Sequence, residues 1–212
     1  MLHVAELWRY PVKSMAGERL ERAALTANGV DGDRLVHVRG PRGVLTSRTK
    51  PRLLGLHGTL RDDGVALVDG LPWDAPESLA AVRSAAGDDA TPVFYDRLDR
   101  FDILPLLVAT DGAIAAFGRD GRRLRPNIVI GGVDGLAERE WEGRSLTIGD
   151  VVIRLEELRA RCVMTTFDPD TQEQDANVLR DINARFGGTL ALNADVATGG
   201  TIAVGDAVVL GD

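Results

Sequence analysis

Turn residues divide this chain into short pieces along its whole length. The sequence holds 24 glycines and 9 prolines in 212 residues, and pieces between them, such as residues 2–8 and 34–39, alternate apolar and polar side chains. Alternation with period two is typical of strands that bury one face, and closely spaced turns are typical of a barrel or sandwich. The pattern therefore predicts a mainly β protein. With only 5% aromatic residues, its core must be built from Val, Leu, Ile and Ala.

Three segments favour short helices instead. Residues 76–86 begin with a proline and end before a glycine, residues 112–118 follow an N-cap candidate at Thr110, and residues 175–186 carry apolar side chains at helical spacing before two glycines. The polar stretch after the first of these helices is the best candidate for a domain boundary. We therefore predict two closely packed domains, residues 1–87 and 88–212.

Composition excludes several classes of function. No run of about 18 apolar residues is present, so we expect no membrane-spanning segment; the N-terminus lacks the form of a signal peptide, which makes the cytoplasm the expected compartment. A single cysteine excludes an internal disulfide framework and a cysteine-rich metal site, and the three histidines lack ligand spacing. The net charge of −7 argues against nucleic acid as a partner.

Positive charge is nevertheless clustered in two places. Six cations and no acid lie between residues 34 and 52, and four arginines lie between residues 119 and 125, opposed only by Asp120. Solvated loops would explain both clusters, and composition alone favours that interpretation. The alternative is a pocket for a compact anion such as a phosphate, which arginine binds in bidentate geometry.

The only thiol, Cys162, follows Arg159 and Arg161 and precedes a predicted strand at residues 163–167. A lone cysteine in a strand is usually a small buried side chain. Nearby cations would instead favour the thiolate, which is the form that attacks electrophiles and binds metals. In a regular strand Arg161 would point away from Cys162, so those cations would have to come from elsewhere, such as Arg34 or Arg125. From local context alone the buried interpretation leads.

Two further segments join a backbone breaker to polar residues. In Arg125-Pro126-Asn127 the proline should hold Arg125 extended, which could aim a guanidinium and an amide at one target; a strand entry with Asn127 in a turn explains the segment equally well. Lys13 is one of two lysines, and Ser14 beside it could donate to a phosphate oxygen. An exposed turn after a strand is the commoner explanation for that pair.

Taken in order along the chain, five segments resemble the MOSC superfamily, named for the C-terminal domain of molybdenum cofactor sulfurase. The resemblance is nearest to members with an N-terminal β-barrel domain, such as the mitochondrial amidoxime reducing component and its bacterial relatives. The matching segments are Tyr10-Pro11-Val12-Lys13-Ser14, Gly32-Asp33-Arg34, residues 124–129, Ile148-Gly149-Asp150 and residues 161–171, which contain Arg161-Cys162. They occur in the family's order and cover nearly the whole chain.

The resemblance implies a MOSC-type β-barrel packed on an N-terminal β-barrel-like domain, with a molybdenum cofactor between the two. In such proteins a molybdopterin dithiolene and one cysteine thiolate hold the metal, and Cys162 matches that cysteine. The positions that match cofactor-binding residues of the family are Lys13, Ser14, Arg34, Arg125, Asn127 and Arg161, with a looser match at Thr110 and Asp111. A terminal phosphate would explain clustered arginines in an acidic chain, and a soft thiolate suits a metal that already carries sulfur ligands.

The activity that the resemblance implies is reduction of N-hydroxylated and related N–O compounds, which are small molecules, by oxygen-atom transfer at the molybdenum. No requirement for pyridoxal phosphate is expected. The single cysteine rules out an appended ferredoxin domain, so we expect electrons from a separate donor protein. Two alternatives stay open: a non-redox module that carries the cofactor or sulfur, and an interaction protein that has kept only the fold.

Overall fold

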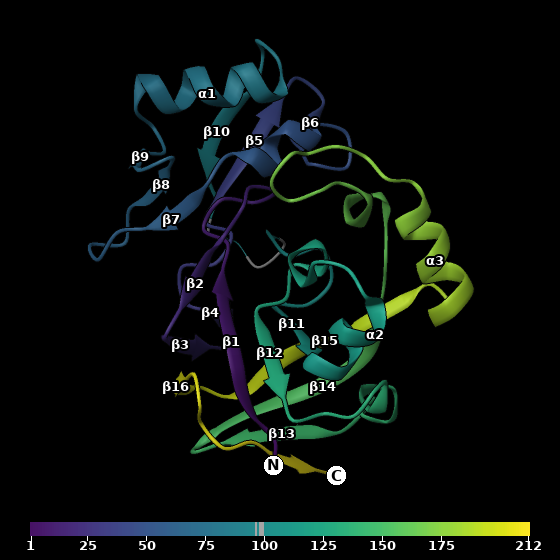
Figure 1. The fold of residues 1–212 in the computed structure, drawn as a ribbon. Coiled ribbons are helices and arrows are strands. Elements are labelled where there is room, and N and C mark those ends of the chain that lie inside the picture. Colours follow the sequence, from purple (N-terminus) through teal and green to yellow (C-terminus); the bar gives the residue numbers. More distant parts are fainter. Residues whose placement is uncertain (96, 98–99) are drawn as a thin grey trace.

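The structure is a computed structural model that describes residues 1–95, 97 and 100–212, and within these residues it has four sheets and three α-helices (Figure 1). The largest sheet has eight strands in the order β17–β13–β14–β15–β11–β12–β1–β2. All neighbours in it are antiparallel except β11 and β12, which are parallel. Its strands are β1 (His3–Arg9), β2 (Glu18–Leu20), β11 (Leu106–Thr110), β12 (Ile128–Gly131), β13 (Ser145–Ile148), β14 (Val151–Ala160), β15 (Thr189–Thr198) and β17 (Val209–Gly211).

Three small sheets, with the strand orders β10–β5–β6, β16–β3–β4 and β7–β8–β9, complete the described part of the fold. Their strands are β3 (Arg22–Thr26), β4 (Gly29–Val30), β5 (Val36–Gly40), β6 (Gly43–Leu45), β7 (Gly58–Leu60), β8 (Ala66–Val68), β9 (Leu71–Pro72), β10 (Thr91–Phe94) and β16 (Gly200–Ala203). The predicted mainly β architecture with three short helices is confirmed. The barrel, however, is not closed in the described residues, because the ladder of the large sheet runs from β17 to β2 and does not return.

Side chains of the sheet β16–β3–β4 pack against the large sheet. Ala23 and Leu25 of β3 and Ile202 of β16 are buried in one hydrophobic cluster with Leu155 of β14 and Leu192 of β15. Burial of these apolar side chains stabilises the fold without a closing ladder of hydrogen bonds. The same cluster contains side chains of β1, so the first strand of the chain packs with the strands of the second half. The boundary after residue 87 stays a prediction.

The first two helices begin where their capping residues predict, whereas the third begins at Asn177, two residues after its predicted start. In α1 (Pro76–Ala86) proline occupies the first turn, and α2 (Asp111–Phe117) is capped by the hydroxyl of Thr110, which accepts a hydrogen bond from the amide of Ala113. The third helix, α3 (Asn177–Phe186), ends at Gly187, which adopts the left-handed conformation.

The strand predicted at residues 163–167 was wrong. This segment forms a 3₁₀-helix, η5 (Val163–Thr166). The hydroxyls of Thr165 and Thr166 donate to the carbonyl oxygens of Cys162 and Val163, at 2.8 and 2.7 Å. β-Branched residues favour strands when only their shape counts, but here these local bonds stabilise a tight turn instead.

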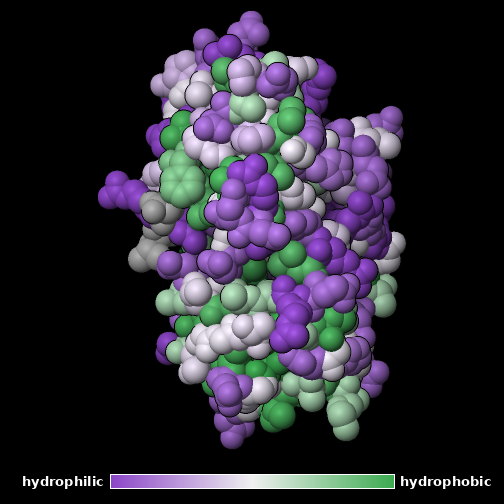
Figure 2. All heavy atoms as spheres, turned by 90° about the vertical axis from the view of Figure 1, so that its left-hand side faces the viewer, coloured by the Kyte–Doolittle hydropathy of each residue, from purple (hydrophilic) through white to green (hydrophobic). Residues whose placement is uncertain are grey.

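None of the helices in the described residues is long and apolar enough to cross a membrane. On the face drawn in Figure 2 hydrophilic and hydrophobic side chains are interspersed. In Figure 1 the small sheets β10–β5–β6 and β7–β8–β9 lie with α1 above the large sheet, and both termini lie at the opposite end of the molecule.

Candidate functional site

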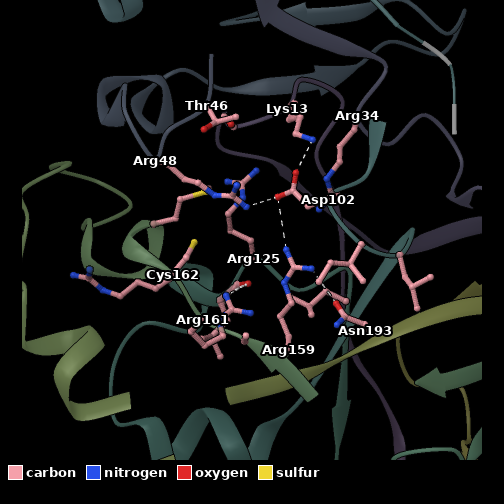
Figure 3. Close-up of a pocket in the computed structure, with 18 of the residues that line it drawn as sticks. Lys13, Arg34, Thr46, Arg48, Asp102, Arg125, Arg159, Arg161, Cys162 and Asn193 are labelled. Atoms are coloured by element: carbon pink, nitrogen blue, oxygen red, sulfur yellow. Dashed lines mark hydrogen bonds and ion pairs between the residues drawn. The ribbon is translucent and has the colours of Figure 1, made fainter. Parts of the chain in front are cut away.

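One pocket brings together side chains from both halves of the chain (Figure 3). Of the nine residues predicted for a site, six line this pocket, and they are Lys13, Ser14, Arg34, Arg125, Arg161 and Cys162. The other lining residues are Thr46, Arg48, Asp102, Ile103, Leu104, Leu106, Leu107, Arg123, Leu124, Arg159, Ala160, Met164 and Asn193. The pocket therefore holds the only thiol of the chain and seven cationic side chains, which are Lys13, Arg34, Arg48, Arg123, Arg125, Arg159 and Arg161.

Two loops of the first half run side by side and deliver Lys13 and Arg34 to the pocket. Tyr10, directly after β1, donates its amide to the Asp33 carboxylate at 2.7 Å and accepts from the amide of Arg34 at 2.8 Å. The amide of Lys13 donates to the carbonyl of Val36 at 2.8 Å. These bonds of the backbone amides fix the two loops relative to each other and so position the side chains of Lys13 and Arg34.

The Asp33 carboxylate is fully buried and accepts hydrogen bonds from three different residues. Besides the Tyr10 amide it accepts hydrogen bonds from the Arg34 guanidinium and from Asn127 Nδ2, the latter at 3.2 Å. Asn127 Oδ1 in turn accepts from the amide of Leu107 at 3.2 Å. Asn127 therefore does not line the pocket; it lies behind Asp33 and fixes the carboxylate that orients Arg34.

The predicted extended conformation of Arg125 was wrong. Arg125 has φ 57° and ψ 51°, which is left-handed, and its amide closes the 3₁₀-helix η3 (Gly121–Leu124) by donating to Arg122 at 3.1 Å. Its guanidinium lies 4.2 Å from the centre of the Tyr10 ring, a cation–π distance. The following proline disfavours the right-handed helical region for Arg125, and this turn is completed through the left-handed one.

Tyr10 is the neutral partner of that stack. Burial raises the pKa of Tyr10 to about 12, although the charges of Arg125 and Arg34 oppose this. The phenol therefore stays protonated and donates to the carbonyl of Pro126 at 3.0 Å. Burial lowers the pKa of Arg125, and no carboxylate among the described residues is bonded to its guanidinium to offset the lost solvation.

Three pocket residues share a strained backbone. Ser14, Arg34 and Arg125 have φ values of 72°, 54° and 57°. For a residue with a side chain the left-handed region costs about 1–2 kcal/mol. Such outliers concentrate at functional sites, where the surrounding structure maintains them.

Cys162 lies between β14 and η5 in extended backbone, and its side chain is partly exposed. Its carbonyl accepts from the amide and the hydroxyl of Thr165, at 3.1 and 2.8 Å, so the turn after it is firmly held. Its sulfur points into the space between the arginines (Figure 3). Because the chain leaves strand geometry here, Arg161 and Cys162 both line the pocket, contrary to the alternation expected of a regular strand.

The Arg161 guanidinium is short of acceptors. Its Nη2 donates to the carbonyl of Leu124 at 2.7 Å, but Nε and Nη1 are buried and have no hydrogen-bond partner among the described residues. Burial, followed by the charge of Arg159, lowers the pKa of Arg161 to about 10, and Cys162 opposes this. A buried cation with unused donors is suited to binding an anion.

Thirteen of the lining residues were not predicted as site residues, and two of them, Asp102 and Asn193, bind the cations of the pocket. Asp102 binds Lys13 and Arg48, each at 2.8 Å, and lies 3.7 Å from Arg159. Asn193 is buried in β15 and accepts from Arg159 at 3.2 Å. A polar residue inside the apolar run at 190–194 was a usable signal for Asn193, whereas no pattern in the sequence sets Asp102 apart.

Thr110 and Asp111 lie outside the pocket lining, where both organise the start of α2. The Thr110 hydroxyl donates to Glu138 at 2.8 Å in addition to its capping role, and the Asp111 carboxylate accepts from the amides of Gly112, Gly132 and Val133. Of the two cation clusters, Arg39, Arg42 and Arg52 are exposed and outside the lining, as the solvated-loop interpretation expects. Arg119 and Arg122 form ion pairs with carboxylates elsewhere.

Family models match two parts of the chain. Residues 1–97 match the MOSC N-terminal beta barrel domain, and residues 114–209 match the MOSC domain. The chain is a member of the MOSC family. The mitochondrial amidoxime-reducing component 1 of Homo sapiens is 27% identical over 79% of this chain and 67% of its own length, and component 2 of Macaca fascicularis is 29% identical over the same shares.

The fold has a counterpart among solved structures. The crystal structure of the YUAD protein from Bacillus subtilis superposes with a TM-score of 0.54, at 14% identity, over 100% of this chain and 97% of that one. At this identity the likeness concerns the fold alone. The MOSC matches and the amidoxime-reducing relatives point to a family whose function involves the molybdenum cofactor. The residues of the pocket fit such a group, because one soft ligand lies beside unused guanidinium donors.

Proposed function

We propose that this protein is a molybdenum-cofactor-dependent oxidoreductase that reduces N-hydroxylated and related N–O compounds. The observation that carries the proposal is the shared pocket of Cys162 and seven cations. A metal bound there would have one thiolate from the protein, and an anionic cofactor would find the charges that it needs. The substrate class is supported by the relatives, which are named as amidoxime-reducing components.

The residues divide into three roles. Cys162 would ligate the metal, and Lys13, Ser14, Arg34, Arg125 and Arg161 would bind the pterin and its phosphate. Asp33 and Asn127 hold Arg34 in place from behind the pocket wall. The protonated Tyr10 supports Arg125 through its ring without placing a negative charge beside the cofactor.

When bound, the cofactor would supply two-electron oxygen-atom-transfer chemistry for reduction of the N–O bond. Conversion of an N-hydroxyl to an N–H group consumes two electrons and two protons and releases one water. The electrons would come from a separate donor protein. The seven cationic side chains of the pocket would orient the cofactor and would not themselves change oxidation state.

Metal analysis of protein made in a host that synthesises molybdopterin tests the cofactor assignment. We expect about one molybdenum per chain in the unaltered protein and a complete loss in Cys162→Ala. Arg125→Gln should also lose most of the metal, because its guanidinium lines the pocket. Arg119→Gln is the matched control: Arg119 pairs with Asp175 and Asp181 outside the pocket, so its metal content should stay unchanged. Metal-free wild-type protein that also fails to take up added cofactor would refute the proposal.

Turnover separates a reductase from a non-redox carrier. The loaded protein, supplied with a reduced viologen as artificial electron donor, should convert benzamidoxime to benzamidine. Full loading with no conversion would replace the reductase by the carrier. Cys162→Ser, which keeps the size of the side chain and loses the soft ligand, should show no conversion above background.

A further inference from the structure

Asp102 is the only acidic side chain among the described residues that line the pocket. Its Oδ1 lies 2.8 Å from Lys13 Nζ, and its Oδ2 lies 2.8 Å from Arg48 Nη2 and 3.7 Å from Arg159 Nη2. Figure 3 shows the carboxylate at the centre of these three cations. The cations come from three distant parts of the sequence, so one short side chain connects them.

A carboxylate is a poor match for this position in both geometry and charge. It has two oxygens for three cations, and the distance of 3.7 Å to Arg159 is too long for a hydrogen bond. Three positive charges also face one negative charge. A phosphoryl group offers three acceptor oxygens and a charge of about −1.5 to −2 near neutral pH, which would satisfy all three cations.

Asp102 is also better placed to move than two of its partners, Lys13 and Arg159. Its side chain is 35% exposed, and residues 101–104 form no helix or strand and no backbone hydrogen bond with any other described residue. Arg159 belongs to β14 in the large sheet, and the backbone of Lys13 is bonded to Val36. A ligand that competes for Lys13 and Arg159 therefore has to displace the more mobile side chain, Asp102, while the exposed Arg48 can follow it.

Asp102 is ionised at neutral pH, so the competition is between two anions. Burial alone would raise the pKa of its carboxyl. The hydrogen bond from Lys13 and the charges of Lys13, Arg48 and Arg159 outweigh burial and hold the pKa below its usual range.

We propose that Asp102 holds the place of a phosphoryl group, which displaces its carboxylate and is then bound by Lys13, Arg48 and Arg159. Arg48 and Arg159 thereby become binding residues of the pocket, and Asp102 becomes a positioning residue that keeps the three cations together and sets the affinity by competing for them. The inference rests on the proposed function only for the source of the phosphoryl group, namely the cofactor.

Titration calorimetry with inorganic phosphate, on protein made in a host that lacks molybdopterin synthesis, tests the displacement. At constant ionic strength, Asp102→Asn should bind phosphate about tenfold more tightly than the unaltered protein, a change of about 1.4 kcal/mol. Arg48→Gln and Arg159→Gln should each weaken binding. The matched control is Asp63→Asn, which removes the same charge from the exposed Arg61–Asp63 pair and should leave the affinity within about twofold.

The sign of the Asp102→Asn effect decides the proposal. If Asp102 merely organised the site, its removal would scatter the cations and weaken phosphate binding. Unchanged or weaker binding therefore overturns the inference. So does a tenfold gain that persists when both Arg48 and Arg159 are replaced by glutamine, because the phosphate would then be bound elsewhere.

The source of the phosphoryl group is read from cofactor-loaded protein. If the cofactor is the source, loaded protein should no longer bind added phosphate, and Asp102→Asn should retain more molybdopterin after dialysis. Phosphate binding to the loaded protein that is still tightened by Asp102→Asn would support the displacement with a phosphorylated substrate as its source. Absence of molybdenum from the loaded preparation would refute the proposed function and leave the phosphate result intact.

Discussion

Replacement of Arg161 by methionine should stabilise the cofactor-free protein and at the same time impair its cofactor binding. Burial above all lowers the pKa of Arg161 from its ordinary range to about 10, which corresponds to a cost of about 3 kcal/mol for the charged form. Its hydrogen bond to Leu124 returns about 1.5–3 kcal/mol. Methionine keeps the apolar stem and removes the charge, so the free energy of unfolding should rise by about 1 kcal/mol.

Urea unfolding followed by tryptophan fluorescence measures this change, provided that the dependence on urea stays the same in both proteins. Arg159→Met is the matched control, two residues away. The guanidinium of Arg159 donates to Asn193 and faces the Asp102 carboxylate at 3.7 Å, so its loss should lower the free energy of unfolding or leave it unchanged. If Arg161→Met raises the free energy of unfolding and Arg159→Met does not, the difference comes from the hydrogen-bond partners of the two arginines and not from the residue type.

The second measurement is molybdopterin content after expression in a producing host. Arg161→Met should retain less cofactor than the unaltered protein in spite of its higher stability, because the unused Nε and Nη1 donors are gone. A variant that is less stable by 1 kcal/mol or more would show that these donors are satisfied in the folded protein. That result would refute the reasoning, whatever the cofactor content.

Three further outcomes follow from the site and its surroundings. Asp33→Asn should lower the free energy of unfolding, measured with urea, by about 3 kcal/mol, because the fully buried carboxylate accepts hydrogen bonds from three donors. Asp31 is exposed, so the control Asp31→Asn should change the free energy of unfolding by less than about 0.5 kcal/mol. Arg125→Gly should be about 1 kcal/mol more stable than Arg125→Ala, since both lose the guanidinium but only glycine tolerates φ 57° without strain; equal stabilities would contradict this. Burial raises the pKa of Glu138, so this carboxyl binds more protons in the folded protein than in the unfolded one, and its contribution to the free energy of unfolding should fall as pH rises above its ordinary pKa of about 4.5. Glu138→Gln should remove this fall and the exposed Glu140→Gln should not, which unfolding curves between pH 4 and 7 would establish.

Local rules were sufficient wherever a single segment determined the outcome. The proline and glycine that flank α1 and the hydroxyl of Thr110 predicted helix ends that the structure confirms. Alternating side chains likewise predicted β1 and β5. In each case the residues that specify the element lie within it or beside it, so no knowledge of distant contacts was needed.

The failures occur where distant contacts or side-chain bonds override local preference. Arg125 was expected to be extended before a proline, yet a turn on one side and the Tyr10 ring on the other place it in the left-handed region. The segment after Cys162 was expected to be a strand, yet two threonine hydroxyls fold it into η5. Asp102 could not be found at all, because its partners are separated from it by tens of residues and only the fold brings them together.

Four of the pocket residues are each costly to the protein by themselves. Ser14, Arg34 and Arg125 are strained in the backbone, and Arg161 is a buried cation with donors to spare. A ligand that binds only the folded chain offsets such costs, by about 4 kcal/mol when its concentration is 1,000 times its Kd. A residue that is unfavourable for folding but favourable for an anion therefore indicates that the site is adapted to its ligand. This is why the departures from local rules at Arg125 and around Cys162 are the most informative features of the structure for function.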